Sequence, residues 1–149
     1  STGKFIMLKK LKSLFSSSIE IEEAEGRPQL IAINHDDYHA EHIGRAEDGS
    51  QFFLTTPFEP KFSNKEGCEY LALFKFDSEG NLIDSEVESF GPRGTFNEDK
   101  RKARYTELLK KLGKVAYQRI EIKPFSITYN KTEIGLIVRE PEDYFYGAF

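Results

Sequence analysis

Apolar and polar residues alternate over much of the chain, and this period of two is typical of β-strands. Pro28–Ile33 is a short apolar run and is predicted to form a strand. Asp48–Gly49 is a strong hairpin signal, because a type I′ turn needs positive φ at both central positions. Its flanks, His42–Ala46 and Gln51–Thr56, are therefore expected to pair as strands.

A second hairpin is predicted over residues 69–90. Glu69–Phe76 is apolar at nearly every position, which favours a central strand that is covered on both faces. Asp77–Asn81 contains the residue types that favour turns. Leu82–Phe90 then returns with polar alternation, so this arm is expected nearer to an edge of the sheet.

One helix is predicted over residues 97–112. Asn97 can cap its N-terminus, the first turn is acidic and the last turn is basic, as the helix dipole favours. Gly113 suits the position after the last turn. Apolar residues three or four positions apart form one stripe that is expected to be buried: Tyr105, Leu108, Leu109 and Leu112.

Three short alternating runs follow the helix, RIEIK, FSITY and EIGLIV, separated by Pro124 and by an Asn130–Lys131 turn. The residues expected to face inward are Ile120, Ile122, Phe125, Ile127, Tyr129, Ile134, Leu136 and Val138. The whole pattern predicts an α+β domain in which a mostly antiparallel sheet of about five to seven strands carries one main helix.

The N-terminal segment, residues 1–18, is predicted to form a short amphipathic helix. Within residues 4–15 the apolar positions recur every three or four residues and the lysines lie on the other side. Docking of this helix on the domain or on a partner is the favoured interpretation, and contact with a membrane surface is an alternative. The lysines interrupt any apolar signal region, and no stretch is long enough to span a bilayer. Met7 is a candidate for the natural first residue.

Length, charge and composition exclude several classes of protein. The chain has 149 residues, which indicates a single domain with a core over 28–140 and an aromatic tail over 141–149. A net charge of -4 argues against nucleic-acid binding, which needs a basic surface. Cys68 is the single cysteine, so an intramolecular disulfide is excluded and a cytoplasmic location is expected. The sequence has no phosphate-binding, dinucleotide or serine-hydrolase motif, and no cofactor is expected.

Three blocks of the sequence, HIGRAEDGSQFF, LFKFDSEGNLIDSEV and IEIKPFSITYNKTEIGLI, lie in that order between residues 42 and 140. They resemble a group of small bacterial proteins labelled formate hydrogenlyase regulatory protein-like. The resemblance implies a regulatory protein without catalysis and carries over no functional residues. The chain departs from that group at its end, where EPEDYFYGAF stands in place of an acidic segment containing Trp.

All three histidines lie within eight residues, and two interpretations follow. If residues 34–43 formed a helix, His35, His39 and His42 would share one face, as a metal site requires. If a strand begins at His42, then His39 and His42 point to opposite faces and cannot share an ion. The strand is favoured, so no metal is expected. A metal-dependent hydrolase that uses these histidines is an alternative.

Two surfaces are candidates for binding a protein partner. The first is basic and comprises Arg93, Lys100, Arg101 and Arg104, and the second is the aromatic tail with Tyr144, Phe145 and Tyr146. The tail is expected to be buried on its own sheet or on another chain.

The predicted function is that of a non-enzymatic regulatory or protein-interaction domain, whose partner the sequence does not identify. A homodimer is one alternative. Another is an immunity-type inhibitor, since a small acidic domain suits the occlusion of a basic toxin or enzyme.

Overall fold

The computed structural model describes residues 19–22, 30–35, 41–59, 67–92 and 94–136. These residues form one helix and eleven strands in three antiparallel sheets. The elements are β1 (Ile19–Glu22), β2 (Leu30–Ile33), β3 (Ile43–Ala46), β4 (Gln51–Thr55), β5 (Phe58–Glu59), β6 (Cys68–Phe76), β7 (Leu82–Gly91), α2 (Glu98–Leu112), β8 (Val115–Tyr117), β9 (Ile120–Ile122), β10 (Phe125–Tyr129) and β11 (Thr132–Leu136).

The predicted α+β class with mostly antiparallel strands is confirmed. The main sheet has six strands, within the predicted five to seven, but the prediction of a single sheet is wrong, because β1, β2, β9, β10 and β11 form two smaller sheets. The predicted N-terminal helix over 1–18 and the aromatic tail over 141–149 lie outside the described residues.

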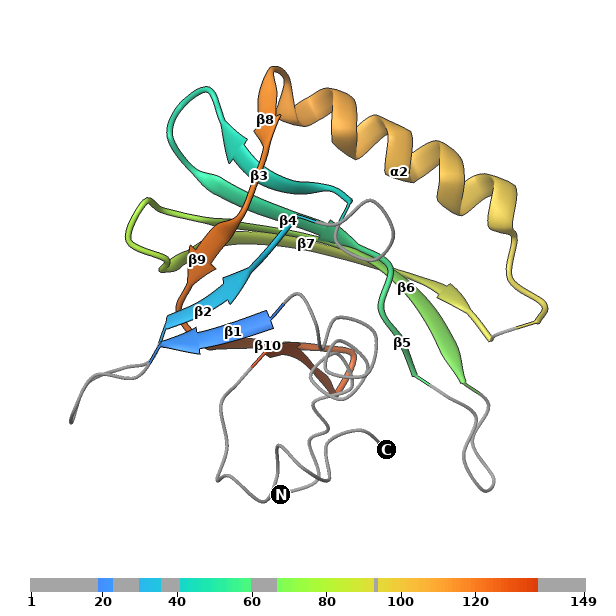
Figure 1. Cartoon of the computed structure of the whole chain (residues 1–149). Coiled ribbons are helices and arrows are strands. Elements are labelled where there is room, and N and C mark those ends of the chain that lie inside the picture. Colours follow the sequence, from blue (N-terminus) through green and yellow to red (C-terminus); the bar gives the residue numbers. More distant parts are fainter. Residues whose placement is uncertain (1–18, 23–29, 36–40, 60–66, 93, 137–149) are drawn as a thin grey trace.

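The main sheet has the order β7-β6-β4-β3-β8, and β5 extends the line of β4 along β6. A three-stranded sheet has the order β1-β2-β9, and β10 and β11 form a separate hairpin. The chain passes from the main sheet to the smaller one between β8 and β9. Figure 1 shows α2 on one side of the main sheet and β1, β2, β9 and β10 on the other.

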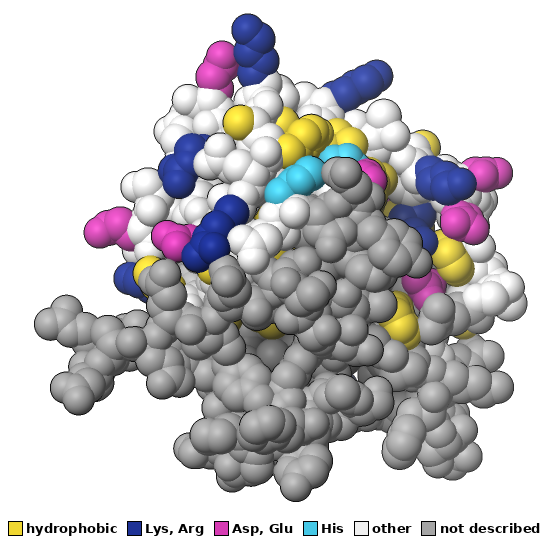
Figure 2. Space-filling model, in the orientation of Figure 1, with side chains coloured by type: hydrophobic (Ala, Val, Ile, Leu, Met, Phe, Trp, Pro, Cys, Tyr) yellow, Lys and Arg dark blue, Asp and Glu magenta, His cyan; other side chains and the backbone are white. Residues whose placement is uncertain are grey.

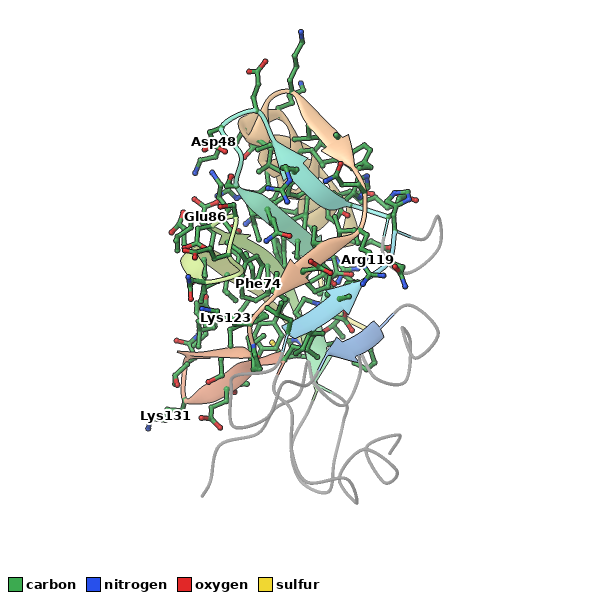
Figure 3. All side chains as sticks on the ribbon, turned by 60° about the vertical axis from the view of Figure 1, so that its left-hand side comes forward. Asp48, Phe74, Glu86, Arg119, Lys123 and Lys131 are labelled. Carbon is green, nitrogen blue, oxygen red and sulfur yellow. The ribbon has the colours of Figure 1, made fainter. Side chains whose placement is uncertain are left out.

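Strand β6 divides the hydrophobic core into two layers. Phe74 and Phe76 face the smaller sheets, and Leu71 and Leu73 face α2, as the alternation of a strand requires. All four are buried, and Figure 3 shows Phe74 in the interior. The prediction of a central strand that is apolar on both faces is therefore confirmed.

The predicted type I′ turn at Asp48–Gly49 is wrong, because only Gly49 has positive φ, at 92°. The Gly49 N–H donates to the Ala46 carbonyl and the Ala46 N–H to the Ser50 carbonyl, which makes a three-residue loop that ends in a bulge. The predicted pairing of the two flanking strands is nevertheless confirmed. The turn with positive φ at both central residues is Asn130–Lys131, between β10 and β11.

Helix α2 begins and ends as predicted. The Asn97 side chain accepts a hydrogen bond from the Lys100 N–H, and the Gly113 N–H donates to the Lys110 carbonyl. Leu108 is buried against the main sheet, and the rest of the predicted stripe packs around it in a partly buried state. Among the described residues, no helix has the length and apolar composition needed to cross a membrane.

The buried side chain of Gln51 joins the two larger sheets. Its amide nitrogen donates to the carbonyls of Asp77, at 3.0 Å, and Glu121, at 2.8 Å. Its amide oxygen accepts from the Glu121 N–H at 2.7 Å. One side chain on β4 thus binds the β6–β7 turn and strand β9, and only 2% of it is exposed.

Replacing Gln51 by Leu keeps the side-chain volume and removes these three hydrogen bonds. We expect a loss of about 2–4 kcal/mol in the free energy of unfolding, because backbone groups lose partners in a buried place. Urea denaturation checks this. Gln118→Leu, the same change at an exposed residue, should shift stability by less than about 0.5 kcal/mol, and equal effects would contradict the joint role of Gln51.

Candidate functional site

Two of the three histidines come together with two tyrosines beside the start of β3. The His42 ring makes edge contacts with Tyr105 of α2, at 5.2 Å between centroids, and with Tyr117 of β8, at 5.5 Å. His35 stacks on Tyr117 at 6.0 Å and donates from Nε2 to the Glu41 carbonyl at 2.9 Å. In Figure 2 the histidine side chains lie next to a group of hydrophobic side chains.

Both ring nitrogens of His42 have partners. The Tyr105 hydroxyl donates to Nδ1, which leaves the proton on Nε2, where Glu41 Oε1 lies at 3.3 Å. Burial lowers the pKa of His42 and outweighs the opposing effect of Glu41. Burial also raises the pKa of the Tyr105 hydroxyl, so this group remains a donor at neutral pH.

This geometry fits a structural contact between α2 and the sheet better than a reactive centre. The His42 nitrogens are engaged, and Tyr105 is held in its protonated form. Residues 41–43 lead directly into β3 rather than forming a helix. His39 lies outside the described residues, and within those residues no three His, Cys, Asp or Glu side chains converge on a point where a metal could bind.

Three basic residues of α2, Arg101, Arg104 and Lys111, are directed at acids of the main sheet. Arg101 contacts Glu69 at 2.9 Å and lies over the Phe96 ring, and Arg104 contacts Glu88 at 2.9 Å. Lys100, from the same predicted surface, is exposed, whereas Arg93 and the tail residues Tyr144, Phe145 and Tyr146 lie outside the described residues.

The outer edge of β7 carries a groove of about 470 Å³. Its floor is the consecutive stretch 85–88 of β7 together with Leu71 of β6. Arg104 and Leu108 of α2 form one wall, and the stretch 127–129 of β10 forms the other. Within the described part of the chain, β7 pairs with β6 on one side and with no strand on the other.

We call this feature the β7 groove. The sequence indicated that β7 lies near an edge, and the structure shows it at the edge. The groove itself was missed, because its walls come from segments far apart in the sequence. Two features of the sequence could have indicated an accessible edge at this place: the polar alternation of β7 and the unusual length of the strand.

The single cysteine of the chain, Cys68, is part of the packing between β6 and β7. Cys68 Sγ lies 3.1 Å from Ser89 Oγ across the β6–β7 pair. Its side chain packs against the core layer that contains Phe74 and Phe76. This setting is typical of a structural thiol.

Comparisons of the chain with protein-family models, with curated proteins and with solved structures found no match. The resemblance to formate hydrogenlyase regulatory protein-like sequences therefore remains a prediction.

The His42 contacts predict a pH dependence of stability. Because the folded state lowers the pKa of His42, its stabilising effect is present above the ordinary pKa of about 6.5 and is lost as the pH falls towards the folded value. Urea denaturation from about pH 7.5 to about pH 5 should show a steeper loss for the wild type than for His42→Asn. Parallel curves would contradict the role of His42.

Arg101 is predicted to stabilise the domain through Glu69, whose side chain is 8% exposed. Arg101→Met removes the guanidinium from this carboxylate and should cost about 3 kcal/mol, because a buried charge is left with fewer compensating contacts. Lys100→Met on the exposed side of the same helix turn should change stability by less than about 0.5 kcal/mol. Equal losses in thermal or urea unfolding would show that the ion pair contributes little.

Proposed function

We propose that the protein is a non-enzymatic protein-interaction domain that binds an extended segment of a partner along the outer edge of β7. One observation carries the proposal. The groove lies over the stretch 85–88 of a ten-residue strand whose outer edge has no strand partner among the described residues.

The edge of a sheet presents backbone N–H and C=O groups that can pair with another strand. A peptide that adds to such an edge gains main-chain hydrogen bonds, and the surfaces on either side of the edge select its alternate side chains. The β7 groove has both parts, because α2 and β10 rise on the two sides of the strand. The groove volume is also within the usual range for ligand sites.

The proposal fits a regulatory protein and an immunity-type inhibitor, which differ in the partner and not in the surface. The acids Asp84, Glu86 and Glu88 on β7 favour a basic partner, as the inhibitor interpretation requires. We also propose that the protein acts in the cytosol.

The test is selection of binders from a displayed library of short peptides, followed by affinity measurements with Thr128→Arg. Thr128 is exposed and lines the groove, so arginine at this position should add bulk and positive charge at the groove wall and oppose a basic partner without disturbing the core. We expect affinity to fall at least about ten-fold, an effect of roughly 1.4 kcal/mol. Amide hydrogen exchange should slow in 82–91 when peptide binds.

Ser126→Arg is the matched control. Ser126 is exposed on the same strand but does not line the groove, so this variant should bind like the wild type. The proposal fails if the library yields no binders, or if the binders do not distinguish Thr128→Arg from Ser126→Arg.

A further inference from the structure

Resting on the proposed function, we infer that the segment bound at β7 is a strand with alternating side chains, basic towards α2 and apolar towards β10. Three observations support this: the orientation of the β7 side chains, the charges on the α2 side of the groove and the apolar surface on its β10 side.

The pairing with β6 fixes the direction of each β7 side chain. Glu86 pairs with Leu73 and Glu88 with Leu71, two residues that face α2. Val87 lies between them and packs on the core layer that contains Phe74 and Phe76, on the side of β10. Successive side chains of a strand added outside β7 would alternate between the same two sides.

The α2 side of the groove has unused acceptor capacity. Glu86 Oε1 accepts from Lys111 Nζ at 2.5 Å, whereas Glu86 Oε2 is buried and has no hydrogen-bond partner. Arg104 donates from Nε to Glu88 and from Nη1 to Glu107, so one cation faces two acids. Acids therefore outnumber cations along this wall. Figure 3 shows Glu86 at the outer margin of the main sheet, on the side away from Arg119.

A lysine or arginine of a bound strand would pair with the Glu86 carboxylate, because this side chain lines the groove and is 31% exposed. The existing Lys111 contact does not prevent this, because Lys111 is 62% exposed and such surface ion pairs are weak. The carboxylate can accept from both cations through its two oxygens.

The β10 side of the groove is suited to apolar side chains. Val87, Ile127 and Tyr129 line it and are only partly buried, so part of their apolar surface faces the groove. An aliphatic side chain placed there removes more of that surface from water. A polar side chain would gain less.

Charge also argues against a second copy of this chain as the occupant. Antiparallel pairing of β7 with β7 around a two-fold axis would bring Glu86 and Glu88 of one chain beside those of the other. Like charges on neighbouring strands are destabilising. A basic strand from a different protein is the better match.

The experiment uses short synthetic peptides that alternate Lys with Val, Glu with Val, or Lys with Thr, and fluorescence anisotropy at low salt. The Lys–Val peptide should bind wild-type protein about five-fold more tightly than the Glu–Val peptide, since one good cross-strand charge pair is worth up to about that factor. The Lys–Thr peptide should also bind more weakly than Lys–Val. The charge preference should shrink as salt is added.

Glu86→Gln is the decisive variant, because it keeps the shape of the side chain and removes its charge. It should reduce the preference for Lys–Val over Glu–Val at least two-fold. Glu79→Gln makes the same charge change at an exposed turn residue outside the groove and should leave the preference unchanged.

The outcomes separate this inference from the proposed function. Library peptides that bind in a Thr128-dependent way but show no basic and apolar alternation, or equal binding of the three synthetic peptides, would overturn the inference and leave the proposed function standing. A Thr128-dependent homodimer in sedimentation would identify a second copy as the occupant and also overturn the inference. If neither the library nor the synthetic peptides bind, both proposals fall.

Discussion

The structure depends on strand β6 being apolar on both of its faces. Such a strand must be covered twice, and no single helix can do so. Helix α2 covers Leu71 and Leu73, and the β1-β2-β9 sheet and the β10–β11 hairpin cover Phe74 and Phe76. Strand β8 stays in the main sheet beside β3, but this requirement explains why β9, β10 and β11 leave it. They are needed as a second layer and not as further strands at its edge.

The two layers are held in place by polar contacts at their margins. Gln51 bonds the main sheet to β9 at the β6–β7 turn, and the Lys123 N–H donates to the Gly80 carbonyl at 2.9 Å in the same region. A Cβ atom at Gly80 would lie 2.9 Å from Ile122 Cα, so the close approach needs glycine. On the other face, ion pairs from Arg101, Arg104 and Lys111 fix α2 against β6 and β7.

Local signals predicted the helix and most of the strands, but not β1, β5 and β8, and they did not predict how the strands assemble into sheets. The cap at Asn97, the spacing of Leu108 and the alternation of β7 depend on neighbouring residues, and each was found where the sequence indicated.

The split into three sheets depends on contacts between distant residues, such as Gln51 with Glu121. Strand β8 has the sequence VAY, in which apolar and polar residues do not alternate. The Asp48–Gly49 turn type was mistaken because the same dipeptide also fits a bulged loop, in which only the glycine needs positive φ. The pairing of His42 with Tyr105 had no sequence signal, since 63 residues separate them.

Among the described residues, the same arrangement that completes the core leaves β7 at an edge of the main sheet. A long strand with an open edge risks pairing with copies of itself, and charged side chains are a common protection. On β7 the charged side chains are acidic, and they alternate with side chains that pack inward. Self-association is opposed by repulsion, but a strand of opposite charge meets no such barrier. The two covering layers, α2 and β10, end beside the strand and form walls along it. The acids that would oppose pairing of this edge with itself would therefore also favour the basic partner that we propose.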